Sequence, residues 1–207
     1  MRRGRILVLN GTSSSGKTTL ASALQSASPE PYEVVGLDRW LKRVPPELFV
    51  VVDSADHPPV DGFLVPMREG IQIALPTLGP AAIEVLKEMY VSFAAGADRG
   101  TNLIVDDVLW HPAALALAIS QFADRDAWLI GVLCPIPVAV AREQQRHDRA
   151  RVGAAMFGEL VHARTVYDTT VDTSVLTPEE AAARILDALQ LNDRPRAFRK
   201  LRSGMTQ

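Results

Sequence analysis

The chain has 207 residues, of which 47% are hydrophobic and 22% are charged, proportions that are ordinary for a globular protein and unlike those of disordered or fibrous chains. This length is enough for one three-layer domain with a sizeable core and too short for two ordinary domains. The formal net charge is -2, so no overall basic field points to nucleic acid as a partner.

The start of the chain places basic residues before an apolar run, but that run is only four or five residues long before Asn10. This pattern predicts a strand and not a signal peptide. No stretch approaches the roughly 18 apolar residues of a membrane span, so we expect no membrane partner. Cys134 is the only cysteine, which excludes an intrachain disulfide and fits a cytoplasmic protein.

Short apolar runs alternate with segments of helical spacing along the chain. The runs predict parallel strands at residues 6–9, 33–37, 103–105, 128–133 and 165–171, and the spacing predicts helices at 17–26, 80–95, 112–122, 137–149 and 178–189. This order indicates a three-layer α/β fold in which a five-stranded parallel sheet is covered by helices on both faces. Its ligands should bind beyond the carboxyl ends of the strands.

The first predicted strand leads directly into a phosphate-binding motif. Residues 11–18 read Gly-Thr-Ser-Ser-Ser-Gly-Lys-Thr and fit the pattern G-x-x-x-x-G-K-[ST], between a strand and a helix as the motif requires. Its backbone amides and the start of the helix should face the phosphates of a nucleotide. Lys17 should bridge the β- and γ-phosphates, and Thr18 should offer its hydroxyl to Mg²⁺. The expected nucleotide-binding residues here are Gly11, Ser13, Ser14, Ser15, Gly16, Lys17, Thr18 and Thr19.

Asp38 closes the second predicted strand, at the same sheet edge as the phosphate-binding loop. A carboxylate there could orient an acceptor hydroxyl and take its proton, which makes Asp38 the candidate general base. The alternative is that Asp38 caps a helix that opens at Arg39. Trp40 could pack on a substrate ring or fill the core.

Residues 45–80 hold seven of the 14 prolines and interrupt the alternation of strands and helices. They predict an insertion that forms an acceptor wall or lid, in which residues 49–52 and 63–65 could pair as a hairpin around the turn at 53–62. Together with Trp40, the side chains of Phe49, Phe63 and Met67 would line an acceptor pocket.

Two successive acids, Asp106 and Asp107, directly follow the third predicted strand. Successive strand residues point to opposite faces, so only one carboxylate can comfortably face a Mg²⁺ ion. We favour Asp106, and expect its neighbour to cap the following helix. The alternative is that both aspartates lie in a solvated loop.

Three arginines recur at spacings of four and three in the predicted helix 137–149, namely Arg142, Arg146 and Arg149. They should share one helix face. Arginines after a fourth strand are suited to binding a triphosphate, stabilising transition-state charge or stacking on a base; the alternative is a solvated charged face. The four histidines are scattered without the spacing of metal ligands.

The last residues, 192–207, carry five basic residues without a convincing apolar stripe. This pattern predicts a solvated, flexible tail that follows a kinase domain at residues 1–191. The sequence does not indicate an oligomeric state.

In these motifs the sequence resembles the chloramphenicol phosphotransferase-like family of P-loop kinases. The resemblance is carried by ILVLNGTSSSGKTTLASALQ, VVGLDRW, LIVDDVLW, GVLCPIPVAVAREQQRHDRARVG and HARTVYDTTVDTS, which cover about half of the chain. The phosphate-binding loop alone identifies only the P-loop NTPase superfamily, whose three-layer α/β fold agrees with the predicted order of elements. The family within that superfamily is indicated by the surroundings of Asp38, the Asp-Asp strand and the arginine helix.

The resemblance implies that Asp38 is the base toward a drug hydroxyl and that Lys17, Arg142, Arg146 and Arg149 handle the nucleotide. It implies ATP with Mg²⁺ and the inactivation of an antibiotic by O-phosphorylation. Residues 45–80 resemble the family only faintly, so the acceptor could be a phenicol, a nucleoside antibiotic or another natural product.

Two other functions compete with this interpretation. A metabolic kinase of the same architecture would act on a nucleoside, a nucleotide or a shikimate-like polyol, although residues 38–80 offer only scattered arginines for a phosphorylated acceptor. A nucleotide-binding regulatory or toxin protein would use the same loop as a switch.

Overall fold

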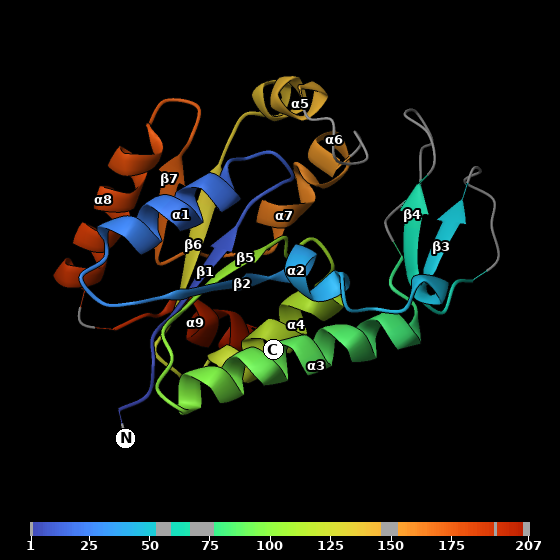
Figure 1. Ribbon diagram of the computed structural model, residues 1–207, viewed down its shortest axis with the longest axis horizontal. Helices are drawn as coiled ribbons and strands as arrows, with labels where there is room; N and C mark the ends of the chain where they lie inside the picture. Colours follow the sequence, from blue (N-terminus) through green and yellow to red (C-terminus); the bar gives the residue numbers. More distant parts are fainter. Residues whose placement is uncertain (1, 53–58, 67–76, 146–152, 193, 205–207) are drawn as a thin grey trace.

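The computed structural model describes residues 2–52, 59–66, 77–145, 153–192 and 194–204 (Figure 1). Its main sheet has five parallel strands in the order β2-β5-β1-β6-β7, which confirms the predicted fold class. The strands are β1 Ile6–Asn10, β2 Glu33–Gly36, β5 Leu103–Asp107, β6 Ala127–Leu133 and β7 Thr169–Asp172.

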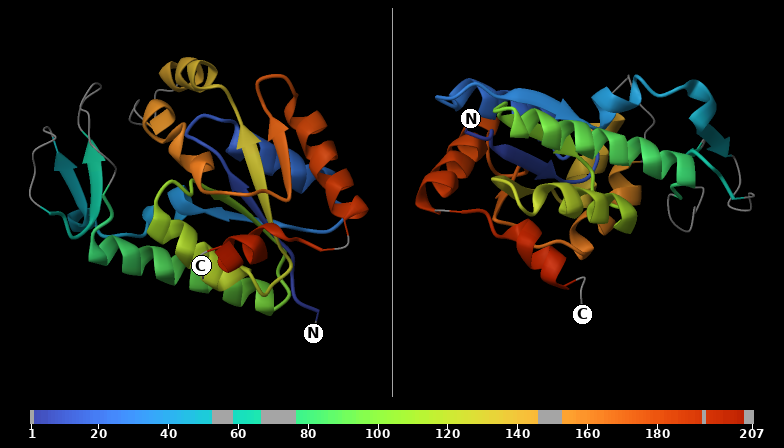
Figure 2. Two further views of the ribbon diagram at one scale, coloured as in Figure 1. Left: turned by 180° about the vertical axis from the view of Figure 1, so that it is seen from behind. Right: turned by 90° about the horizontal axis from the view of Figure 1, so that it is seen from below.

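Helices cover both faces of this sheet (Figures 1 and 2). The helices α1 Lys17–Ala27 and α8 Pro178–Leu191 pack on one face, and α3 Pro80–Asp98, α4 Pro112–Phe122 and α9 Ala197–Gly204 pack on the other. Four shorter helices, α2 Leu37–Leu41, α5 Ile136–Gln144, α6 Gly153–Phe157 and α7 Leu160–Ala163, complete the helices of the described residues. None of the described helices is long and apolar enough to cross a membrane.

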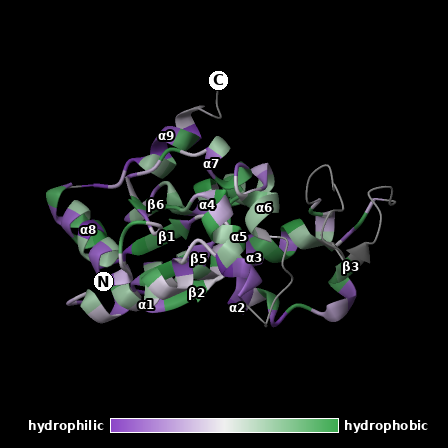
Figure 3. Ribbon diagram, turned by 90° about the horizontal axis from the view of Figure 1, so that it is seen from above, coloured by the Kyte–Doolittle hydropathy of each residue, from purple (hydrophilic) through white to green (hydrophobic). Residues whose placement is uncertain are grey.

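The central strand β1 shows why both faces are covered. Its side chains are fully or almost fully buried and alternate between two apolar cores, with Ile6 and Val8 on the α3 side and Leu7 and Leu9 on the α1 side. Successive strand residues point to opposite faces, so an uninterrupted apolar run requires helices on both. Figure 3 accordingly shows the central strands mostly in hydrophobic colours.

Several boundaries differ from those predicted. The second strand ends at Gly36, so Leu37 begins a helix, and the last strand begins at Thr169 and not at residue 165. The helix that carries Arg142 ends at Gln144, and Arg146 and Arg149 lie outside the described residues.

The predicted hairpin in residues 45–80 is wrong. Strands β3 Phe49–Val52 and β4 Phe63–Pro66 do pair, but in parallel, as a separate two-stranded sheet beyond the start of α3 (Figure 1). Asp61, near the end of the predicted turn at 53–62, instead caps the start of α3, because its carbonyl and carboxylate accept hydrogen bonds from the amide of Ala81 at 3.0 and 3.2 Å. A 3₁₀ turn, Pro46–Leu48, precedes β3.

The predicted solvated tail is also wrong for residues 197–204, which form α9. Phe198 is only 2% exposed and packs edge-on against Phe122, with ring centroids 5.6 Å apart. The Asp168 carboxylate accepts the amides of Arg196 and Ala197 at 2.6 and 3.0 Å and so holds the start of the helix. The apolar stripe of so short a helix is too brief to recognise among five basic residues.

Candidate active site

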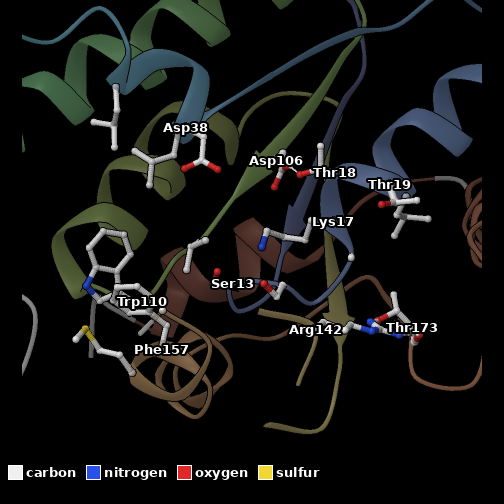
Figure 4. Close-up of a pocket in the computed structure, with 18 of the residues that line it drawn as sticks. Ser13, Lys17, Thr18, Thr19, Asp38, Asp106, Trp110, Arg142, Phe157 and Thr173 are labelled. Atoms are coloured by element: carbon white, nitrogen blue, oxygen red, sulfur yellow. Dashed lines mark hydrogen bonds between the residues drawn. The ribbon is translucent and has the colours of Figure 1, made fainter. Parts of the chain in front are cut away.

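A cavity of about 650 Å³ lies at the carboxyl ends of the parallel strands. Residues that end or follow β1, β2, β5 and β7 contribute to its wall, as expected for the ligand site of an open parallel sheet. Figure 4 shows the side chains that surround it.

The loop between β1 and α1 forms one end of the cavity. Ser14 and Gly16 have φ angles of 57° and 90°, in the left-handed region that glycine enters without strain. No side chain caps α1, so the first amides of the helix can be used by an anionic ligand. Of the expected nucleotide-binding residues in this loop, Ser13, Ser14, Gly16, Lys17, Thr18 and Thr19 line the cavity. Gly11 and Ser15 belong to the same loop but are buried and do not line the cavity.

Lys17 and Thr18 lie at the first turn of α1. The Lys17 side chain points into the cavity in Figure 4, and its Nζ donates a hydrogen bond to the carbonyl oxygen of Thr12 at 2.8 Å. The hydroxyl of Thr18 donates to the Asp106 carboxylate at 2.6 Å. Lysine, hydroxyl and carboxylate thus occur side by side at the floor of the cavity.

The two acids at the end of β5 have separate environments. Asp106 lines the cavity, whereas Asp107 is 2% exposed and accepts hydrogen bonds from the Tyr90 hydroxyl and the Val108 amide, each at 2.7 Å. Burial raises the pKa of Asp107 to about 6. Asp107 therefore lies away from the position expected of a metal ligand, and it does not cap α4, whose N-cap is His111.

Asp38 lies in the first turn of α2, is exposed and lines the cavity. Helix α2 begins at Leu37 with Gly36 as its N-cap, so Asp38 is not the cap of a helix that opens at Arg39. Gly36 brings this segment against β5, because a Cβ at Gly36 would lie 2.1 Å from the carbonyl oxygen of Asp106. Figure 4 draws both carboxylates and Lys17 around the same cavity.

Arg142 of α5 reaches the loop that follows β7. Its guanidinium donates to the Thr173 hydroxyl at 3.2 Å and to the Thr173 carbonyl at 2.7 Å, and one nitrogen lies 3.6 Å from the sulfur of Cys134. Arg142 and Thr173 both line the cavity. Among the three predicted arginines, Arg142 is the one that the described residues include.

The other end of the cavity is apolar and aromatic. Phe49 and Phe63 stack with ring centroids 5.4 Å apart, and Trp110 lies 4.9 Å from Phe157 of α6. All four line the cavity, together with Leu37, Leu41, Leu64, Leu78, Val108 and Met156.

Trp40 is not part of this wall, which corrects the sequence prediction. Its ring packs edge-on against Phe93 at 5.9 Å, and Arg43 lies 5.6 Å from the ring centroid on the helix surface. A tryptophan two residues after Asp38 on a helix points away from it, toward the core. Met67 lies outside the described residues.

Helix α6 connects the two ends of the cavity. The Thr12 hydroxyl lies 3.3 and 3.1 Å from the carbonyl oxygens of Gly153 and Ala154, and the buried Glu143 carboxylate accepts the Ala154 amide at 3.1 Å. The start of α6 is thus fixed to the phosphate-binding loop, and its end presents Phe157 to Trp110.

A buried polar network supports the end of β1. Asn10 donates to the Val161 carbonyl at 2.7 Å and to the Tyr167 hydroxyl at 2.8 Å, and that hydroxyl lies 2.6 Å from Nδ1 of His162. Burial and the nearby charge of Lys17 lower the pKa of His162. This network positions α7 behind the loop.

Sequence reasoning missed Trp110, Phe157, Thr173 and Glu143. A usable signal existed for two of them, because Trp110 and Thr173 lie within three residues of the carboxyl ends of β5 and β7, where ligands of parallel sheets bind. No pattern in the sequence marks Phe157 or Glu143, whose roles depend on the placement of α6.

A family model described as chloramphenicol phosphotransferase-like protein matches residues 4–190. Two curated proteins from strains of Mycobacterium tuberculosis, each named "Putative O-phosphotransferase", are 30% identical over 203 residues, which cover 98% of this chain and 89% of theirs.

Solved structures share the fold at lower identity. The APS kinase CysC of Mycobacterium tuberculosis in complex with AMPPNP and APS has a TM-score of 0.56 and 18% identity, covering 92% of this chain and 99% of its own. The tunicamycin resistance protein of Deinococcus radiodurans has a TM-score of 0.58 and 18% identity, covering 93% and 99%.

Proposed function

The chain belongs to the chloramphenicol phosphotransferase-like family, and we propose that it transfers the γ-phosphoryl group of ATP to a hydroxyl of a neutral, ring-bearing antibiotic. Its family and its P-loop kinase fold make it a phosphotransferase with a hydroxyl acceptor. The observation that carries the finer proposal is a cavity with a phosphate-binding loop and Asp38 at its polar end and aromatic side chains at the other.

The polar end is suited to a nucleoside triphosphate. The amides of residues 13–19 and the Lys17 ammonium would bind the β- and γ-phosphates, and Arg142 would add positive charge from α5. The Thr18 hydroxyl and the Asp106 carboxylate, 2.6 Å apart, are oxygen ligands of the kind that Mg²⁺ takes beside phosphate oxygens. When bound, Mg²⁺ would neutralise charge on the phosphates.

Asp38 would act as the general base. As the acceptor oxygen forms its bond to the γ-phosphorus, the bond from that phosphorus to the bridging oxygen breaks and ADP leaves. The proton of the acceptor hydroxyl passes to the Asp38 carboxylate and from there to solvent, since Asp38 is exposed. The products are a phosphate monoester, ADP and a proton.

The acceptor end favours a neutral compound with a ring. Among the described residues that line the cavity, the cations are Lys17 and Arg142, and both lie at the nucleotide end. A phosphorylated or carboxylate-bearing acceptor would leave its charge desolvated among Leu41, Phe63 and Trp110. An aromatic or fused ring would instead bury apolar area against these side chains.

The test is a mass-spectrometric screen for the gain of one phosphoryl group. The purified protein is incubated with Mg²⁺ and ATP and with hydroxylated antibiotics, nucleosides and shikimate, beside the Lys17→Ala variant. We expect an antibiotic to gain a phosphoryl group only with the wild-type protein. Modification of a nucleoside or shikimate and of no antibiotic would refute the antibiotic proposal.

A metabolic kinase is the second candidate function, because the APS kinase of Mycobacterium tuberculosis has this fold. The tunicamycin resistance protein shares the same fold, so the fold is compatible with both roles.

ATP turnover without any acceptor would favour a third role, that of a nucleotide-driven switch. We place the enzyme in the cytoplasm, where ATP is supplied and the free thiol of Cys134 stays reduced.

A further inference from the structure

Thr173 is the first residue after β7 and joins three segments of the nucleotide end. Its amide donates to the Leu133 carbonyl at the end of β6 at 3.0 Å, and its hydroxyl donates to the Ser15 carbonyl of the phosphate-binding loop at 2.6 Å. The same hydroxyl accepts a hydrogen bond from Arg142 at 3.2 Å, and its carbonyl accepts a second at 2.7 Å.

The hydroxyl of Thr173 both donates and accepts a hydrogen bond in this arrangement. A hydroxyl has one proton to donate and two lone pairs to accept with, and here the proton serves the loop while a lone pair serves the guanidinium. The two bonds from Arg142 to Thr173 fix the guanidinium plane more tightly than one bond could. The Thr173 side chain also lies 3.6 Å from the position of a Cβ at Gly16, so it packs directly on the loop.

We propose that Thr173 is a positioning residue that fixes Arg142 and the phosphate-binding loop relative to each other for nucleotide binding. A long arginine side chain loses conformational entropy when it binds a ligand. Because Thr173 already holds Arg142 in one conformation, this entropy is lost when the protein folds and does not weaken nucleotide binding. This inference rests on the proposed binding of ATP. It concerns the nucleotide alone, so it does not depend on which acceptor is used.

The test measures Mg²⁺-ADP binding by isothermal titration calorimetry, without any acceptor. Thr173→Val keeps the shape of the side chain but removes the hydroxyl, and we expect about ten-fold weaker binding, the size of a lost hydrogen bond to a charged group. Thr173→Ser keeps the hydroxyl and should bind as the wild-type protein does. Thr101→Val, an exposed threonine away from the cavity, is the matched control.

A double-mutant cycle separates positioning from a general effect on folding. If Thr173 acts through Arg142, then Thr173→Val should weaken ADP binding far less in an Arg142→Ala background than in the wild-type background. Equal losses in the two backgrounds, unchanged binding by Thr173→Val, or a Thr173→Ser variant as weak as Thr173→Val would each overturn the proposal. Should Thr173→Val not fold, Thr173→Ala removes the same oxygen and takes its place in the cycle.

The experiment also distinguishes this inference from the proposed function. A wild-type protein that binds no Mg²⁺-ADP contradicts the proposed use of ATP. A wild-type protein that binds Mg²⁺-ADP with an affinity that Thr173→Val leaves unchanged contradicts the role of Thr173 alone.

Discussion

At the scale of single residues, Asp38 and Asp106 both line the cavity at one sheet edge but come from different elements. Asp106 ends β5 and accepts the Thr18 hydroxyl at 2.6 Å, whereas Asp38 lies in the first turn of α2. We expect Asp38→Asn to lower the turnover of the acceptor by about 10²–10⁴-fold, the range for loss of a general base, and to leave Mg²⁺-ADP affinity unchanged. Steady-state kinetics and calorimetry would measure the two effects.

Asp124→Asn is the control for this substitution, because Asp124 is an exposed carboxylate that pairs with Arg202 away from the cavity. It should turn over the acceptor at the wild-type rate. Wild-type turnover by Asp38→Asn would remove the base assignment.

Asp107 should make the stability of the protein depend on pH. Burial raises its pKa from 3.8 in the ordinary carboxyl to about 6, so between these values the folded protein binds a proton that the unfolded chain has released. The free energy of unfolding therefore falls as pH rises through this window, and the loss is complete above the folded pKa. Asp107→Asn cannot titrate there, so its stability relative to the wild-type protein should rise by about 2 kcal/mol between pH 4 and pH 7.

Urea unfolding of the wild-type protein and of Asp107→Asn across this pH range, without nucleotide or Mg²⁺, measures the difference between their free energies of unfolding. The contributions of the other titrating groups are common to both proteins and cancel in this difference. Tyr90→Phe is a second test, because it removes the hydrogen bond that lowers the pKa of Asp107. The fall in the free energy of unfolding should therefore extend to higher pH in this variant. Parallel stability curves for the wild-type protein and Asp107→Asn would contradict the assignment.

At the scale of elements, α6 is placed by contacts distant in sequence. Glu143 is 3% exposed and accepts the amide of Ala154, and an unpaired buried amide costs about 1–3 kcal/mol. We expect Glu143→Ala to speed hydrogen exchange at residues 153–157 and to lower kcat/KM for the acceptor about ten-fold, by loosening Phe157 at the acceptor wall. Glu143→Gln keeps one acceptor oxygen, so its exchange rate and its kcat/KM should lie between those of the wild-type protein and Glu143→Ala.

The matched control is Glu159→Gln, since Glu159 is exposed and its side chain does not cap α7. Exchange at residues 153–157 should stay at the wild-type rate in this variant. If Glu143→Ala exchanges there no faster than Glu159→Gln, the anchoring role of Glu143 is refuted.

Elements with a strong local signal could be predicted, and those determined by distant contacts could not. The start of α1 follows from the phosphate-binding motif, and the start of α4 follows from the proline after His111; both signals act within a few residues. The pairing of β3 with β4 and the packing of α6 depend on partners elsewhere in the chain. The same division holds in the cavity, where Lys17 and Asp38 carry recognisable sequence contexts and Phe157 carries none.

At the scale of the whole molecule, the cavity and the C-terminal helix α9 serve different purposes. The cavity lies at the carboxyl ends of the strands, whereas α9 packs on the sheet face that α4 covers and contributes no residue to the cavity wall. Arg202 binds Asp124 at 2.6 and 2.9 Å and connects α9 to the loop after α4. The C-terminal helix should therefore determine stability and leave catalysis alone.

Phe198→Ala tests this separation. Phe198 is 2% exposed among Phe122 and neighbouring core residues, and truncation of a buried phenylalanine costs about 3–5 kcal/mol through lost burial and the cavity left behind. Urea unfolding should show this loss, while kcat and KM of the folded fraction stay at wild-type values. Lys200→Ala, on the exposed side of the same helix, should change neither. A Phe198→Ala protein of wild-type stability would show that α9 is dispensable to the core, and one with altered KM for ATP would show that α9 is coupled to the nucleotide site.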